Sequence, residues 1–137
     1  MEIRALRAGD ELLLTGASHL FDAPVDEEGA RRFLGTTGHH LLVAYEEDLP
    51  VGFVSGVEMT HPDKGSEMFL YELGVDAHHR RRGIGRALVE RLAAVARDHG
   101  CYGMWVVTDE ENIAARATYE RTGAISETSQ VVEVWTF

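Results

Sequence analysis

The chain has 137 residues, the size of one domain, and 45% of them are hydrophobic, which is enough for a buried core. Its formal net charge of −10 argues against nucleic acid as the main partner, because phosphate contacts need a basic face. Without an apolar run of roughly 18 residues or a signal-peptide pattern, and with Cys101 as its single cysteine, the chain is expected to be cytoplasmic, with no disulfide and no membrane partner.

The first part of the chain is predicted to hold one strand and two helices. Glu2–Leu6 has the composition of a short strand, and Asp10 and Asp26 are candidate N-caps of helices that end near Leu20 and Leu34. The residues expected to face the core are Leu12, Leu13, Ala17 and Leu20 in the first helix, and Ala30, Phe33 and Leu34 in the second.

Three strands in hairpin connection are predicted next. Residues 40–46, 51–59 and 67–75 are rich in β-branched and aromatic side chains. The segments 47–50 and 60–66 contain Pro50, Pro62 and Gly65, which favour turns. Consecutive strands with short connections should be antiparallel neighbours in one sheet.

The second part of the chain adds helices at residues 83–99 and 112–122, which end at Gly100 and Gly123. Between them, residues 102–108 are predicted to be a strand, and residues 130–137 alternate enough to be a last strand. The predicted fold class is therefore α+β: a mixed, mostly antiparallel central sheet flanked by about four helices.

A run of arginine and glycine opens the helix at residues 83–99, with the sequence Arg80-Arg81-Arg82-Gly83-Ile84-Gly85. Backbone N–H groups in a first helical turn lack intrahelical partners, so this run predicts an anion site with a spacing that suggests a pyrophosphate. A P-loop is excluded because Arg86-Ala87 stands where it needs Lys-Ser or Lys-Thr, and a dinucleotide fingerprint is disfavoured because Leu88 replaces its third glycine. The pattern Arg/Gln-x-x-Gly-x-Gly/Ala matches at every position. An ordinary arginine-rich turn is the alternative.

This turn, the strand before it and a later helix resemble the GNAT superfamily of acyl-CoA-dependent N-acyltransferases over nearly the whole chain. Tyr71-Glu72-Leu73-Gly74-Val75 looks like the family's central, bulged strand. The helix that runs from Asn112 through Tyr119 to Gly123 is similar to its Asn-x-x-Ala-x-x-x-Tyr-x-x-x-Gly helix. The resemblance implies a single GNAT domain over residues 1–137, with acetyl-CoA as acetyl donor and co-substrate.

The resemblance also implies roles for individual residues. A backbone cradle for the CoA pyrophosphate would comprise Arg80, Arg81, Arg82, Gly83, Ile84, Gly85 and Arg86. Leu73 and Val75 would pair with pantetheine, with the Val75 N–H at the developing oxyanion. Tyr119 would bind the cofactor and donate a proton to the CoA thiolate, and Asn112 would contact the cofactor. The alternatives are core residues at 73 and 75, a packed tyrosine at 119 and a helix N-cap at 112.

Glu72 is the candidate catalytic base and a candidate ligand for the substrate's ammonium groups. An unpaired buried carboxylate is costly, so a structural ion pair with an arginine is the alternative. Strand alternation places Tyr71 and Leu73 on the opposite face, so the role requires a bulge that rotates the strand. Further candidates for binding a cationic substrate are Asp22, Asp109, Glu110 and Glu133, with Asp26, Glu27, Glu28, Glu58 and Glu111 as additional acids that can equally be solvated surface groups.

A narrower likeness concerns the substrate. Residues 66–75, 79–84 and 110–123 look like the class I aminoglycoside 3-N-acetyltransferases, which typically have Asp-Leu-Ala-Val where this chain has Glu72-Leu73-Gly74-Val75. This likeness implies acetylation of an aminoglycoside antibiotic at its 3-amino group, by direct transfer in a ternary complex, and hence antibiotic resistance. The alternatives are another amine (a polyamine, an amino acid or a protein N-terminus) and a non-catalytic acyl-CoA-binding module.

The expected partners are therefore acetyl-CoA and a small cationic amine, which the acidic balance of the chain would attract, although an acidic surface also simply favours solubility. A homodimer is expected because a last strand at residues 131–137 would offer a free edge. We predict no metal, because His39, His40 and His61 show no metal-like spacing with a nearby acid or cysteine.

Overall fold

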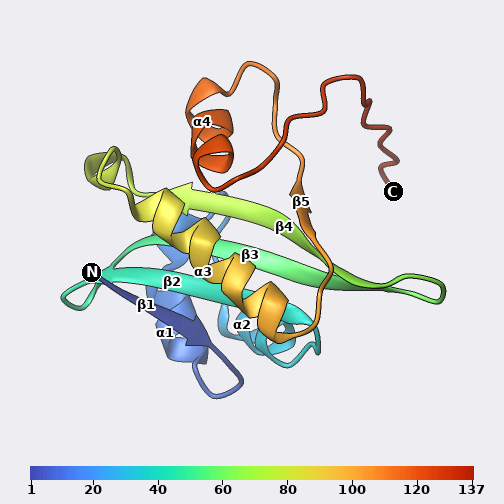
Figure 1. Ribbon diagram of the computed structural model, residues 1–137. Coiled ribbons are helices and arrows are strands. Elements are labelled where there is room, and N and C mark those ends of the chain that lie inside the picture. The colour runs from blue at the N-terminus through green and yellow to red at the C-terminus, as the bar shows by residue number, and fades with distance from the viewer.

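A five-stranded sheet forms the centre of the protein in a computed structural model that describes residues 1–137 (Figure 1). The strands follow one another in sheet order: β1 (Glu2–Leu6), β2 (His39–Glu46), β3 (Leu49–His61), β4 (Gly65–Val75) and β5 (Met104–Val106). The first three neighbouring pairs are antiparallel, and only β4 and β5 are parallel. The predicted mixed, mostly antiparallel sheet is confirmed.

Four α-helices flank this sheet, as predicted: α1 (Glu11–Gly16), α2 (Glu27–Leu34), α3 (Ile84–Asp98) and α4 (Ile113–Arg121). Helix α3 crosses one face of the sheet, α1 and α2 lie behind the other face, and α4 lies beyond β4 (Figure 1). None of these helices has the length and apolar character needed to cross a membrane.

The core has two layers, one on each face of the sheet. On strand β2, Leu42 and Ala44 pack in a cluster with α3, and Leu41 and Val43 pack in a cluster with α1 and α2. Because successive side chains of a strand point to opposite faces, a central strand covered on both faces is apolar at nearly every position. This explains the unbroken buried run from Leu41 to Tyr45.

The first helix differs from its prediction. It ends at Gly16 and is followed by a separate 3₁₀ turn, Ser18–Leu20. Asp10 makes no side-chain cap, because its carboxylate accepts the Arg7 N–H instead. Leu14 and Ala17 are buried, whereas Leu12 is 80% exposed and Leu13 also lies outside the core. The short helix thus presents a different stripe to the sheet. Asp26 does cap α2, by accepting the Gly29 N–H at 2.7 Å.

The predicted last strand is wrong. Residues 130–137 are irregular and pair with no strand. Their apolar side chains, Val131 and Trp135 among them, are exposed and do not join the core. Apolar alternation alone does not make a strand, because the backbone also needs a neighbour, and the adjacent β5 has only three residues instead of the predicted 102–108. The predicted loop at 60–66 is shorter than expected, since β3 runs to His61 and β4 begins at Gly65.

Candidate functional site

Strand β4 contains a bulge at Tyr71. Its partner β3 pairs Ser55 with Glu72 but Gly56 with Leu70, so Tyr71 is one extra residue. Leu70 packs in the α3 cluster before the bulge, and Leu73 packs against the same cluster after it. The bulge therefore rotates the strand, so that Leu73 joins Leu70 on the α3 face and Glu72 takes the opposite face.

Past the bulge, Glu72 lies on the face covered by α1 and α2. Gly74 faces the cluster that packs on α1 and α2, because a Cβ added there would lie 2.7 Å from the ring of Phe53. Glu72 is two residues earlier in the strand and therefore lies on the same face. The Glu72 N–H donates to the buried Ser55 hydroxyl at 3.2 Å, which fixes the strand at this point. No local pattern singles out Ser55, because only the strand register brings it to the bulge.

An opening separates β4 from β5 beyond the bulge, because the two strands pair only through Met68–Leu70 and Met104–Val106. The Asp76 N–H donates to the Val51 carbonyl of β3. Since alternate residues of an antiparallel strand bond to the same neighbour, Leu73 and Val75 direct their N–H groups away from β3, toward the opening. Arg80 confirms this direction, since its Nε donates to the outward carbonyl of Val75 at 3.2 Å.

The loop between β4 and α3 has the backbone geometry of an anion site. The backbone φ is 62° at Arg81 and 80° at Gly83, whereas Arg82 between them does not have a positive φ. Such alternation turns successive N–H groups toward one side. Helix α3 begins at Ile84 without a side-chain cap, so its first-turn N–H groups stay available. Gly83 provides the left-handed conformation at little cost.

The arginine side chains of this loop are partly engaged by the protein itself. Arg82 donates to both carboxylate oxygens of Glu46, at 3.0 and 3.1 Å, and Arg86 donates to Glu90 at 2.8 Å. Because these two guanidinium groups are paired with carboxylates, residues 82 and 86 can offer an anion chiefly their backbone N–H groups. The loop backbone therefore has the geometry of an anion site, and its role as a pyrophosphate cradle stays a prediction.

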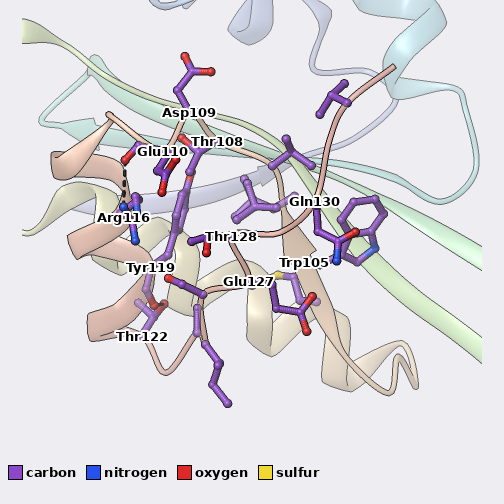
Figure 2. Close-up of a pocket in the computed structure, with 18 of the residues that line it drawn as sticks. Trp105, Thr108, Asp109, Glu110, Arg116, Tyr119, Thr122, Glu127, Thr128 and Gln130 are labelled. Carbon is purple, nitrogen blue, oxygen red and sulfur yellow. Dashed lines mark hydrogen bonds between the residues drawn. The ribbon is translucent and has the colours of Figure 1, made fainter. Parts of the chain in front are cut away.

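A groove of about 820 Å³ lies between α4, β5 and the segment that follows α4, residues 122–137, which we call the C-terminal segment. In Figure 2, Arg116, Tyr119 and Thr122 project from α4 on one side of this groove, and Trp105 stands on the other. The Trp105 ring packs on Phe69 of β4 with centroids 4.4 Å apart. Trp105 was not predicted as a site residue, because a lone tryptophan in a short strand gives no specific signal.

Tyr119 combines a buried ring with a place on the groove. It belongs to the α3 core cluster and is 9% exposed. Burial raises the pKa of its hydroxyl, which keeps the proton on the oxygen at neutral pH. The same helix begins at Asn112, whose Oδ1 accepts the Ala115 N–H at 3.1 Å, so the N-cap interpretation of Asn112 is confirmed.

Glu72 forms no ion pair, in contrast to the alternative weighed from the sequence. Its pKa is raised, first by burial and then by the negative charge of Asp22, which follows the 3₁₀ turn. The fold thus brings Asp22 and Glu72 together without a compensating basic side chain.

The remaining acids do not join this pair. Asp109 and Glu110 line the groove beside α4, and with Glu111 and Asn112 they also line a polar depression of about 500 Å³. The main-chain carbonyl of Glu110 accepts from Arg116 at 2.9 Å (Figure 2). Glu133 is exposed in the C-terminal segment and lines neither cavity.

Comparisons with known proteins find chains of similar fold and sequence. The chain is similar to two aminoglycoside acetyltransferases from uncultured soil metagenomic samples. Crystallised with trehalose, meta-AAC0020 is 21% identical (TM-score 0.90, covering 99% of this chain and 95% of that one), and HMB0005 is 26% identical (TM-score 0.81, covering 98% of each). Human N-acetyltransferase 8 is 32% identical over 94 residues, which are 68% of this chain. That alignment spans only 41% of the human protein.

A family model described as "Acetyltransferase (GNAT) family" matches residues 10–124, which include the bulged strand, the glycine-rich loop and the Tyr119 helix. Acetyltransferases of this family use acetyl-CoA, and the N–H groups of Leu73 and Val75, which point away from β3, and the loop backbone stay the candidates to hold it. The chain therefore belongs to the acetyltransferase (GNAT) family.

Proposed function

We propose that this chain acetylates an amino group of an aminoglycoside antibiotic, at the 3-amino position, with acetyl-CoA as donor. The observation that carries the proposal is the pair of carboxylates, Glu72 and Asp22, which have no basic partner beside the opening in the sheet. Two neighbouring carboxylates attract a substrate with several ammonium groups more strongly than an uncharged substrate. The likeness to an aminoglycoside acetyltransferase at 26% identity over 98% of both chains supports this choice.

In this proposal, acetyl-CoA supplies an acetyl thioester, and the chain holds it through main-chain groups. The pyrophosphate cradle is the loop from Arg80 to Arg86, and Leu73 and Val75 offer N–H groups on the free side of β4. The Val75 N–H is the candidate donor to the oxyanion, because a fixed backbone dipole stabilises developing charge without reorganisation.

Two side chains would move protons. Glu72 accepts a proton from the substrate ammonium, directly or through water, and its raised pKa makes it a stronger base than an ordinary glutamate. Tyr119, which its raised pKa keeps protonated, donates to the departing thiolate. Asp22 binds a second ammonium group of the same substrate, and Asp109 and Glu110 stay candidates for the outer part of the acceptor site. Loss of positive charge on the product would weaken the antibiotic's binding to ribosomal RNA and confer resistance.

A screen of free-thiol release with acetyl-CoA tests the proposal. The panel contains a 3-amino aminoglycoside of the gentamicin type, the same scaffold without the 3-amino group, spermidine, single amino acids and a short peptide with a free N-terminus. We expect turnover of the first compound and loss of turnover with the second. Turnover of another amine alone would overturn the antibiotic assignment, and acetyl-CoA binding with no thiol release would favour a non-catalytic module.

A second candidate is acetylation of a different amine, such as a polyamine, an amino acid or a protein N-terminus. The observation that favours it is the match to human N-acetyltransferase 8, which is more similar in sequence than either antibiotic enzyme but aligns over 41% of its own length. The same screen separates the two candidates.

We also propose a homodimer, although not through the strand first expected. The chain leaves β5 as a short sheet edge. Val131, which lines the groove beside β5, is 82% exposed, and Trp135, four residues later, is 76% exposed. Exposed apolar groups beside a free strand edge favour association. Light scattering coupled to size exclusion measures the mass directly, and a W135S variant should shift it toward the monomer. A wild-type mass of 15.2 kDa across concentrations would contradict the dimer.

A further inference from the structure

Three side chains that could bind a metal meet at the end of α3 remote from the glycine-rich loop. His40 Nε2 lies 2.6 Å from Glu58 Oε2, and His99 Nδ1 lies 3.3 Å from the same oxygen. The two imidazole rings are nearly perpendicular, with centroids 4.8 Å apart. One potential ligand atom from each residue lies within 4.8 Å of the others. None of the three belongs to the acetyl-transfer site proposed above.

Sheet register explains why His40 and Glu58 meet. His40 pairs with Gly56, and Glu58 is two residues further along β3, so both side chains point to the same face. That is the face of α3, because a Cβ at Gly56 would touch Leu92 at 3.0 Å. The Glu58 N–H donates to the Gly38 carbonyl at 2.9 Å, which anchors the strand beside the cluster.

His99 is held in place by the end of α3. It is the C-cap, Gly100 follows with φ at 77°, and the Gly100 and Cys101 N–H groups donate to the Arg97 and Ala96 carbonyls. This is a Schellman motif, in which the positive φ turns the chain sharply after the helix. The turn sets the His99 ring over Glu58 and fixes the third ligand.

We propose that His40, Glu58 and His99 form a site for a divalent transition-metal ion, with Zn²⁺ as the expected occupant. Two imidazoles and one carboxylate are a common three-ligand set for zinc, with water in the fourth position. His40 and Glu58 are mostly buried, at 18% and 19% side-chain exposure, whereas His99 is 48% exposed and leaves an entry path. The ligand atoms are therefore already close together, and an ion can reach them from solvent past His99.

The ion would act on the structure and not on the chemistry. Helix α3 has 15 residues and so spans about 22 Å, which separates this site from the loop at its other end. A bound ion would fasten the end of α3 to β2 and β3. No metal was predicted from the sequence because His40, Glu58 and His99 lie far apart in the chain, and only the fold brings them together.

Metal titration of the full chain, stripped with EDTA, tests the proposal. We expect one Zn²⁺ per chain by calorimetry, a rise in Tm with added Zn²⁺, and a tetrahedral visible spectrum with Co²⁺. H40Q, E58Q and H99Q should each weaken binding at least tenfold. The matched control is H61Q, because His61 also pairs with a glutamate, Glu67, at 3.0 Å but has no third ligand. H61Q should bind as the wild type does.

A second measurement covers variants that fail to fold. In wild-type protein, the ring ¹⁵N resonances of His40 and His99 should shift on addition of Zn²⁺, while those of His61 stay in place. No Zn²⁺ binding by the wild type, equal loss in H61Q, or shifts confined to other histidines would each overturn the proposal. The acetyltransferase activity is not used as a readout, so failure of this site and failure of the proposed function are distinguishable.

Discussion

The Glu72 carboxyl has a raised pKa, first because it is buried and then because the negative charge of Asp22 lies close to it. Burial is the larger cause, and neither acid has a basic partner in the chain. A buried carboxylate beside a like charge is destabilised unless a cation binds it. The arrangement therefore suits a residue that binds an ammonium group and then accepts its proton.

Substitution of Glu72 by glutamine should lower kcat/KM by about 10²- to 10⁴-fold, because a general base contributes on that order. Acetyl-CoA affinity should stay within about twofold, since the side chain points to the other face from Leu73 and Val75. Steady-state kinetics with the best amine and calorimetry with acetyl-CoA measure the two effects. Unchanged turnover would remove Glu72 from the mechanism.

The D22N variant should shift the acid limb of the pH–rate profile to lower pH. Glu72 works as a base only when it is deprotonated, and removal of the Asp22 charge lowers its raised pKa. The profile of kcat/KM for the free enzyme reports this group. D26N is the matched control, because Asp26 only caps α2. An identical acid limb in D22N and wild type would contradict the coupling.

The stability of the chain should also reveal the raised pKa of Glu72. A carboxyl whose pKa is higher in the folded state retains its proton longer than in the unfolded state, so stability falls as pH rises from the ordinary glutamate range through the folded pKa. E72Q removes this penalty. We expect E72Q to be more stable than wild type at pH 7 and no different near pH 3, in urea unfolding at both pH values. Equal stability at both would count against the raised pKa.

Replacement of Tyr119 by phenylalanine should lower kcat about 10²-fold, as expected for loss of a proton donor. The ring stays in the core, so Tm should change little. Y45F is a useful control, because the Tyr45 hydroxyl is buried without a hydrogen-bond partner and lies in the other core cluster. Y45F should keep full activity with stability equal or raised by about 1 kcal/mol. Full activity of Y119F would contradict its role.

Alanine at Gly83 should weaken acetyl-CoA binding and lower stability by about 1–2 kcal/mol, because φ at this position is 80°. There is open space around it, so the effect comes from the backbone and not from a clash. G16A is the control, since Gly16 also has open space but no positive φ. Thermal unfolding and the KM for acetyl-CoA separate the two variants, and equal behaviour would argue against a strained loop.

Local patterns were enough to predict the hairpin connection of the three middle strands, the main helices and the glycine-rich loop. The orientation of Leu73 and Val75 was not predictable from alternation, because one extra residue at Tyr71 reverses which face each later side chain occupies. The strand predicted at residues 130–137 failed for a different reason, since pairing depends on a partner that a single segment does not reveal. His40 and His99 come together only through register and a helix C-cap, neither of which leaves a local pattern.

The parting of β4 from β5 has a kinetic consequence. If acetyl-CoA binds along the outward groups of Leu73 and Val75 and the amine binds at Glu72, as proposed above, the two reactants approach β4 from opposite faces of the sheet. Neither then has to wait for the other to bind or to leave. Initial velocities measured against both substrates should give intersecting double-reciprocal lines. CoA should compete with acetyl-CoA, and the acetylated product should compete with the amine.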